Sequence, residues 1–257
     1  KPEPCRVDVG RRGLRFAARG RSLMRRGLCG ALLFLAMRAE ALASLKRVTF
    51  VRHGESVMNV ALARKPWGSA GFADPDIRDA PLTPRGEAQA KALAARLAKG
   101  AALRDVDALV SSPLTRALQT AALVFGDARG LPAVATALAA ERLYLSSDLG
   151  ASRQDLEAMW PAWDFGAVSA GEWWYQPEDA RAAEWRPPGD YVCPGEPVDA
   201  FCKRMDALID WLKLRDEAHI ALVCHWGVLD VITGESFENC EARTFLVDDL
   251  FVRRPAE

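Results

Sequence analysis

Three short runs rich in β-branched and aromatic residues constrain the fold more than any other feature of the chain. They are Arg47 to Val51, Val106 to Val110 and His219 to Cys224. Each run is nearly continuously apolar, which is typical of a strand buried on both faces in a parallel sheet. Each is followed directly by polar residues, so each is expected to deliver polar side chains to a loop at the end of a strand.

Helical patterns separate these strands. Thr83 is placed to cap a helix that has Pro84 at its first position and Gly100 beyond its end. A second helix is predicted from about Leu114 to Val124, and apolar residues recur at helical spacing from Val198 to Leu212. Strands that alternate with helices predict an α/β fold of three layers, a mostly parallel sheet with helices on both faces.

The regular pattern is interrupted between Pro161 and Pro197. Proline, glycine and acidic residues in this segment are interleaved with four tryptophans: Trp163, Trp173, Trp174 and Trp185. Linkers are poor in tryptophan, and a long loop with its own aromatic residues is typical of a lid or a pocket wall. The sequence therefore predicts an irregular Trp-rich insertion that covers the functional edge of the sheet.

Composition excludes several classes of protein. The chain has 257 residues, of which 50% are hydrophobic and 26% charged, enough to bury a full core in one domain and unlike a disordered chain or a coiled coil. Lys plus Arg and Asp plus Glu number 34 each. This balance argues against a globally basic nucleic-acid binder, so no nucleic-acid partner is expected.

The charges are distributed unevenly along the chain. Residues 1–43 contain ten basic and three acidic side chains, a net charge of +7, which leaves −7 for the remainder. The apolar run from Leu28 to Met37 is too short for a stable membrane span in the mature chain. We expect residues 1–43 to be a leader outside the fold and residues 44–257 to be the catalytic domain.

Three origins of this leader stay open. A charged start, an apolar middle and the small residues of Ala41-Leu42-Ala43 are typical of a secretory signal peptide. An Arg-rich organellar transit peptide and upstream sequence read through as protein are the alternatives. The localisation is therefore secretory, organellar or, without targeting, cytoplasmic.

Cysteine usage gives no metal or disulfide framework. The predicted domain contains four cysteines and no C-x-x-C pair: Cys193, Cys202, Cys224 and Cys240. If the chain is secreted, Cys193 and Cys202 are the pair to test for a disulfide bond.

The ends of the three predicted strands carry groups suited to binding an anion. Arg52 and His53 follow the first strand, Arg116 lies just beyond the loop after the second, and His225 follows the third. Parallel strands bring these ends to one edge of the sheet. Two guanidinium and two imidazole groups would form a dense cluster of donors suited to a phosphoryl group, so a small phosphorylated substrate is expected.

Four motifs resemble the histidine phosphatase superfamily, in its phosphoglycerate mutase-like branch. They occur in the family's order and at its spacing: VRHGESVMN (51–59), LTPRGEAQA (82–90), SSPLTRALQTA (111–121) and VCHWG (223–227). The resemblance implies the phosphoglycerate mutase-like α/β fold for the region from about residue 45 to 240.

The resemblance also implies roles for individual residues. His53 would be the nucleophile that becomes a phosphohistidine, and Arg52, Arg116 and His225 would bind the phosphoryl oxygens. Asn59 would complete the pocket. These roles agree with the chemistry of the groups, because a neutral imidazole is a good nucleophile and two arginines can neutralise a phosphoryl group without a metal.

The resemblance also implies a proton donor, and the chain departs from the family pattern at one position. Glu141 falls where the family keeps its proton donor, and Asp148 and Glu157 are alternatives nearby in the chain. Trp226 occupies a position that is glycine or another small residue in many members. Either its backbone N–H faces the phosphate while its indole forms part of the pocket wall, or the indole points inward and narrows the site.

These inferences predict a hydrolase, a metal-independent phosphatase with no cofactor. The arginine beside His53 would repel a cation, so the three histidines are not expected to form a metal site, and His219 is expected to be a half-exposed residue at the start of a strand. A phosphoglycerate-type mutase is the first alternative, but no cluster of basic and aromatic residues for a bisphosphate is found in the insertion. A non-hydrolytic phospho-ligand or protein-binding module is the second, and the oligomeric state stays open.

Overall fold

The structure is a computed structural model of the chain, and it describes residues 45–99, 105–126, 130–176 and 195–254. Contacts divide the chain between Leu45 and Lys46, and every helix and strand named below lies in the second unit, Lys46–Glu257. The predicted leader lies outside the described residues, so its boundary at residue 43 stays a prediction.

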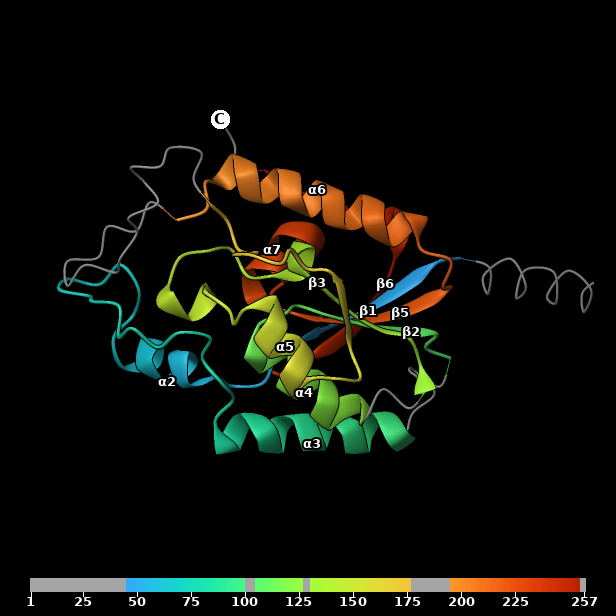
Figure 1. The fold of residues 1–257 in the computed structure, drawn as a ribbon, viewed down its shortest axis with the longest axis horizontal. Helices are drawn as coiled ribbons and strands as arrows, with labels where there is room; N and C mark the ends of the chain where they lie inside the picture. The colour runs from blue at the N-terminus through green and yellow to red at the C-terminus, as the bar shows by residue number, and fades with distance from the viewer. Residues whose placement is uncertain (1–44, 100–104, 127–129, 177–194, 255–257) are drawn as a thin grey trace, which may run out of the picture. The chain divides into compact units, whose positions relative to one another are not determined.

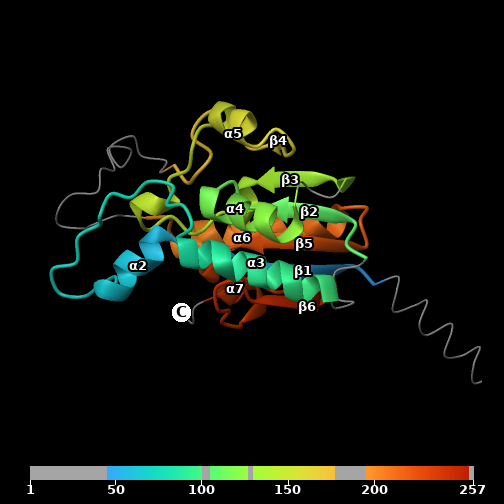
Figure 2. The ribbon, with the colours of Figure 1, turned by 90° about the horizontal axis from the view of Figure 1, so that it is seen from below.

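A six-stranded sheet forms the centre of the fold, in the order β4-β3-β2-β5-β1-β6 (Figure 2). Its strands are β1 (Arg47–Arg52), β2 (Ala108–Ser111), β3 (Ala133–Thr136), β4 (Asp164–Ala167), β5 (His219–Cys224) and β6 (Ala242–Leu246). All neighbouring pairs are parallel except β1 and β6, which are antiparallel. The three predicted strands are confirmed as the adjacent trio β2-β5-β1.

Helices cover both faces of this sheet (Figure 1). They are α2 (Val57–Arg64), α3 (Pro84–Lys99), α4 (Thr115–Phe125), α5 (Arg153–Met159), α6 (Val198–Leu214) and α7 (Trp226–Thr233). Helices α6 and α7 lie on one face, and α3 and α4 lie on the other. The predicted three-layer α/β fold with a mostly parallel sheet is therefore confirmed.

The alternation of side chains along the central strands separates two cores. On β1, Phe50 faces the core with α6 and α7, while Val51 faces the core with α3 and α4. On β5, Leu222 and Val223 divide in the same way. This is the two-residue period of a strand whose two faces are both buried.

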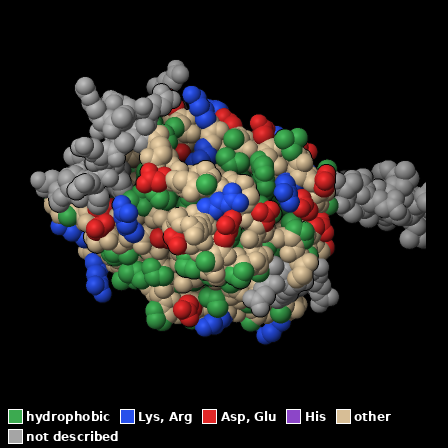
Figure 3. Space-filling view, viewed as in Figure 1, with side chains coloured by type: hydrophobic (Ala, Val, Ile, Leu, Met, Phe, Trp, Pro, Cys, Tyr) green, Lys and Arg blue, Asp and Glu red, His purple; other side chains and the backbone are tan. Residues whose placement is uncertain are grey.

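The surface carries charges of both signs. Basic and acidic side chains are interspersed over the face shown in Figure 3, with apolar side chains between them. None of the described helices has the length and apolar character that a membrane crossing requires.

The predicted insertion is irregular only in part. Residues Asp164–Ala167 form β4, which pairs in parallel with β3, so the prediction that regularity fails from Pro161 was wrong at this point. Trp173 is buried in a core cluster with Leu118 and Phe165, and its indole N–H donates to Ala151 O at 2.9 Å. Trp173 thus packs in the core, in a cluster that also includes Leu156 of α5. Residues 177–194 of the predicted insertion, which include Trp185 and Cys193, lie outside the described residues.

His219 also differs from its prediction. It was expected to be half exposed, but only 1% of its surface is accessible. Its ring nitrogens lie 2.8 Å from Thr49 Oγ1 and 3.1 Å from Asp105 Oδ1. The side chain is buried at the start of β5 because two neighbouring polar groups satisfy both of its nitrogens.

The loop after β1 packs directly against the first turn of α3. The Cα of Gly86 faces the backbone of Glu55, and a Cβ added at Gly86 would lie 2.1 Å from Glu55 O. Gly54 has the reverse relation, since its Cβ would lie 2.6 Å from Gly86 O. These two glycines allow α3 to approach the residues that follow His53.

This contact predicts that Gly86→Ala destabilises the protein. The new methyl group would overlap backbone atoms that cannot rotate away, which costs about 1–3 kcal/mol in a packed site. Gly171→Ala is the matched control, because its Cβ would meet no described atom within 4 Å. Urea unfolding of both variants measures the difference, and equal midpoints would contradict the proposed packing.

Candidate active site

The carboxyl ends of β2, β5 and β1 meet at one edge of the sheet. His53 N donates to Cys224 O at 3.0 Å, and Ser112 N donates to Val223 O at 3.0 Å. The backbone therefore continues the sheet pairing just beyond each strand. The residues that leave the three strands are brought side by side, as the sequence predicted.

His53 is held as a neutral imidazole. Only 3% of its surface is accessible, and its Nδ1 lies 2.7 Å from Gly54 O. A carbonyl oxygen can only accept, so Nδ1 carries the proton and Nε2 carries the lone pair. Burial, reinforced by the positive charge of Arg116, lowers the pKa of His53 well below its usual value. The geometry leaves a buried, uncharged nitrogen able to act as a nucleophile.

His225 lies against His53, with ring centroids 5.1 Å apart and planes inclined by 55°. Its side chain is fully buried, yet neither ring nitrogen has a hydrogen-bond partner among the described residues. An unpaired buried polar atom is costly, so a native structure that keeps one calls for a specific explanation, such as a catalytic role. Burial and the charge of Arg116 lower the pKa of His225 well below its usual value.

Arg116 is fixed by a buried ion pair. It lies in the first turn of α4, where Nη1 donates to Ser147 O at 2.7 Å and Nη2 donates to Asp148 Oδ1 at 2.9 Å. Both side chains of the ion pair are only 5% accessible. These contacts use two of the five N–H donors of a guanidinium, and the others can bind an anion.

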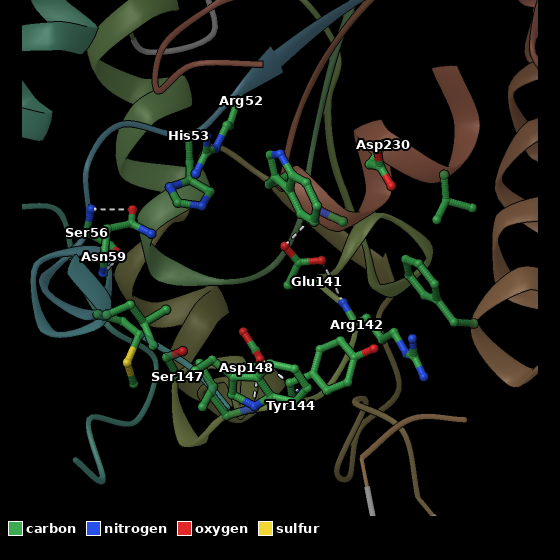
Figure 4. Close-up of a pocket in the computed structure, with 18 of the residues that line it drawn as sticks. Arg52, His53, Ser56, Asn59, Glu141, Arg142, Tyr144, Ser147, Asp148 and Asp230 are labelled. Carbon is green, nitrogen blue, oxygen red and sulfur yellow. Dashed lines mark hydrogen bonds between the residues drawn. The ribbon is translucent and has the colours of Figure 1, made fainter. Parts of the chain in front are cut away.

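Arg52 and Asn59 complete the donor set. Arg52 Nη1 donates to Phe237 O at 2.6 Å, which fixes one edge of its guanidinium. Asn59 Oδ1 accepts a hydrogen bond from Ser56 N at 3.0 Å as part of the cap of α2. The carbonyl end of the amide is therefore occupied, and its nitrogen end is turned toward His53 (Figure 4).

Glu141 is supported by two backbone donors. Its Oε1 accepts from Arg142 N at 2.9 Å and its Oε2 from Gly227 N at 3.1 Å (Figure 4). A Cβ at residue 227 would lie 2.4 Å from Glu141 Oε1, so a larger residue here would displace the Glu141 carboxyl group. Burial, and then the negative charge of Asp148, raise the pKa of Glu141. This carboxyl group therefore retains a proton to a higher pH than an exposed one.

The two alternative proton donors have other contacts. Asp148 Oδ1 binds Arg116, and its Oδ2 accepts from Tyr144 N at 3.1 Å and Leu145 N at 3.0 Å. Glu157 lies on α5, where it pairs with Arg153 at 2.7 Å and is 48% accessible. Of these three described residues, Glu141 alone lines the cavity with a carboxyl group that forms no ion pair.

One cavity of about 680 Å³ brings most of the predicted residues together. Six of them line it: Arg52, His53, Asn59, Arg116, Glu141 and Trp226. His225 is not one of the lining residues, but its ring lies next to that of His53. The indole of Trp226 is part of the wall, 45% of its surface is accessible, and its Nε1 donates to Ser236 Oγ at 3.0 Å.

Sequence reasoning did not find several residues of this cavity. Arg142, Ser147, Phe201, Asp230 and Arg253 line it as well. They follow no strand and form no short motif, and only the adjacency of Arg142 to Glu141 could have indicated one of them. Among the residues that the structure describes, no three His, Cys, Asp or Glu side chains group in a way that could hold a metal ion.

The sequence of the chain matches a known family. The model of the histidine phosphatase superfamily (branch 1) matches residues 48–245. The chain therefore belongs to the histidine phosphatase superfamily, as its four motifs predicted.

Individual relatives are distant. A phosphoglycerate mutase-like protein of Arabidopsis thaliana is 26% identical over 223 residues, which cover 76% of this chain and 76% of the relative. The solved alpha-ribazole phosphatase of Shigella flexneri is 25% identical, with a TM-score of 0.45, and the match covers 72% of this chain and 76% of that one. The phosphoglycerate mutase of Thermus thermophilus is 24% identical, with a TM-score of 0.43, and the match covers 82% of this chain and 99% of that one.

The lowered pKa values of His53 and His225 predict that acid weakens the fold. Below pH ~6.5 the unfolded chain binds protons that these folded imidazoles do not, so stability is lost as pH falls, by up to about 1.4 kcal/mol per pH unit for each histidine. His225→Gln should therefore lose less unfolding free energy than the wild type between about pH 7.5 and pH 5.5.

Buried carboxyl groups with raised pKa values, such as Glu141, have the opposite effect: they increase the unfolding free energy as pH falls, in the wild type and in the variant alike. The informative quantity is thus the difference between wild type and variant, measured by urea unfolding at each pH. Parallel pH dependences would show that His225 does not titrate differently in the two states.

Proposed function

We propose that this protein is a metal-independent phosphatase that hydrolyses a phosphomonoester through a phosphohistidine on His53. The observation that carries the proposal is the pair of buried imidazoles. His53 has its Nδ1 bonded to Gly54 O, which leaves Nε2 as the nucleophile, and His225 beside it has two buried nitrogens without a partner among the described residues. Membership of the superfamily supports the same chemistry.

In the first half-reaction, Nε2 of His53 attacks the phosphorus atom and the bond from phosphorus to the ester oxygen breaks. Arg52, Arg116 and His225 donate hydrogen bonds to the phosphoryl oxygens and stabilise the charge that spreads over them. Asn59 adds an amide N–H donor. Phosphoryl transfer depends mainly on such positioning and charge stabilisation, which a fixed set of donors provides.

The leaving oxygen needs a proton, and Glu141 supplies it. The raised pKa of Glu141 keeps its carboxyl group protonated at a pH where an exposed glutamate is ionised. In the second half-reaction the resulting carboxylate takes a proton from water, the water oxygen attacks the phosphorus atom, and the bond to His53 breaks. Inorganic phosphate leaves, and both residues return to their starting states.

A phosphoglycerate mutase is the second candidate, because the Arabidopsis relative carries a mutase-like name. A mutase would return the phosphoryl group from His53 to another hydroxyl of the substrate instead of to water. The two activities use the same donors and the same nucleophile. They differ in product, since a mutase releases no net inorganic phosphate.

The experiment that tests the proposal measures phosphate release from a panel of phosphomonoesters, including 3-phosphoglycerate and a sugar phosphate, with a chelator present. The wild type should release phosphate, and His53→Ala should lose about 10³-fold or more of this turnover. His219→Gln is the matched control, because this imidazole lies at the opposite end of the sheet, and it should retain turnover. Isomerised phosphoglycerate without free phosphate would favour the mutase, and ligand binding without any turnover would favour a docking module.

The contacts of Asp148 predict a second effect on catalysis. In Asp148→Asn the negative charge that raises the pKa of Glu141 is removed, so that pKa falls. Glu141 acts in its protonated form, and activity is lost as pH rises through its pKa. The basic limb of the kcat profile should therefore move to lower pH.

Arg116 also loses its ionic partner in Asp148→Asn, so kcat/KM should fall roughly tenfold. Glu157→Gln, on α5, is the control and should leave both the profile and kcat/KM unchanged. A loss of activity without movement of the basic limb would show that Asp148 acts on Arg116 alone.

A further inference from the structure

The cavity extends beyond the groups assigned to phosphoryl transfer. Arg142 and Asp230 lie on the opposite side of Glu141 from His53 (Figure 4). In the proposed function Glu141 gives its proton to the leaving oxygen, so the alcohol half of the substrate must continue past Glu141 into this region. We call this region the far pocket, and its residues are Arg142, Val198, Phe201, Asp230, Val231 and Arg253.

Several contacts join these residues into one surface. The guanidinium carbon of Arg142 is 5.9 Å from the ring centroid of Phe201, and Val198 lies one turn before Phe201 on α6. Arg253 N donates to Val231 O at 2.8 Å, and this hydrogen bond holds the C-terminal segment against α7. The far pocket is therefore built from α6, α7, the segment after Glu141 and the C-terminal segment.

One part of this surface is apolar. Val198 and Phe201 on α6 and Val231 on α7 present aliphatic and aromatic side chains to the cavity. The cavity as a whole, about 680 Å³, lies in the ~300–1,000 Å³ range of pockets that enclose ligands of drug size. A short polar alcohol would leave these apolar side chains in contact with water, whereas a longer hydrocarbon chain would cover them.

The other part of the far pocket is positively charged. Arg142 is held in place, since its guanidinium carbon lies 4.4 Å above the Tyr144 ring and its Nε donates to Glu196 O at 2.7 Å. No ion pair among the described residues involves Arg142 or Arg253, whereas Arg254, which also lines the cavity, pairs with Asp206. Asp230 is the carboxylate of the far pocket. Two arginines without an ionic partner among the described residues, with one carboxylate in the same pocket, favour an anionic group on the ligand.

We infer that the substrate is the phosphate ester of an alcohol with an apolar stretch and an anionic group at its far end, such as a phosphorylated hydroxy acid with a chain longer than that of phosphoglycerate. This inference rests on the proposed function, which fixes the position of the phosphoryl group. The apolar stretch would lie along Val198, Phe201 and Val231, and the anion would meet Arg142 and Arg253.

The test of the apolar stretch uses ethyl, butyl and hexyl phosphate with the full-length chain. These esters release primary alkoxides of similar basicity, so the chemical step is nearly the same and differences in kcat/KM report binding of the chain. We expect kcat/KM to rise with length by up to about fourfold per buried methylene group.

The test of the anionic group compares hexyl phosphate with the same ester bearing a terminal carboxylate. The carboxylate should raise kcat/KM about tenfold in the wild type, and Arg253→Gln should remove most of this gain. Arg153→Gln is the matched control, because it removes an arginine of α5 that does not line the cavity. In this control the preference for the carboxylate should persist.

The outcomes separate the two proposals. Phosphate release from all the esters, with no dependence on chain length or on the carboxylate, overturns the far-pocket inference and leaves the proposed phosphatase intact. A carboxylate preference that survives Arg253→Gln and Arg142→Gln alike also overturns it. Failure to release phosphate from any ester, together with no turnover in the wider panel, overturns the proposed function itself and the inference with it.

Discussion

The buried ion pair of Arg116 and Asp148 joins the parts of the candidate active site. Arg116 belongs to α4, which follows the central strand β2, whereas Asp148 ends the short helix Ser146–Asp148 in the segment that also carries Glu141. Asp148 accepts two backbone N–H groups of that segment as well. One carboxylate therefore positions both the guanidinium that is proposed to bind the phosphoryl group and the loop that carries the proposed acid. A buried pair of this kind is strongly destabilising when one partner is lost, because the other charge is left uncompensated.

Burial at this edge of the sheet acts on acids and bases in opposite directions. It disfavours the charged form of every group, so it lowers the pKa of His53 and His225 and raises the pKa of Glu141. A nucleophile must be deprotonated and a general acid protonated at the same pH, and burial favours both states at once, whereas the charge of Arg116 lowers the pKa of the two imidazoles and of Glu141 alike. In the proposed function, the phosphoryl group would add negative charge beside Arg52 and beside Arg116, whose guanidinium already pairs with Asp148.

The sequence correctly predicted which residues lie together when those residues directly follow a strand. Arg52, His53 and His225 adjoin predicted strands, and the parallel order of β2, β5 and β1 fixes their proximity without knowledge of any loop. The sequence did not predict the surroundings of residues that contact segments far away along the chain. His219 was expected at the surface, but Thr49 and Asp105 from other segments bury it. The far pocket combines α6, α7 and the C-terminal segment, and no local pattern indicates that these meet.

The motif LTPRGEAQA, residues 82–90, illustrates how a motif can act without touching a substrate. None of its residues lines the cavity. Thr83 Oγ1 donates to the Glu55 carboxylate at 2.8 Å, and Glu55 N donates to Gln89 Oε1 at 2.8 Å. Gly86 allows the backbones to approach. The residues of the motif VRHGESVMN (51–59) therefore have two roles. Arg52 and His53 face the cavity, whereas Glu55 turns toward α3 and anchors the loop. Because the orientation of the His53 ring in the cavity depends on this loop, substitutions at the α3 contact should affect the proposed phosphoryl transfer as well as folding.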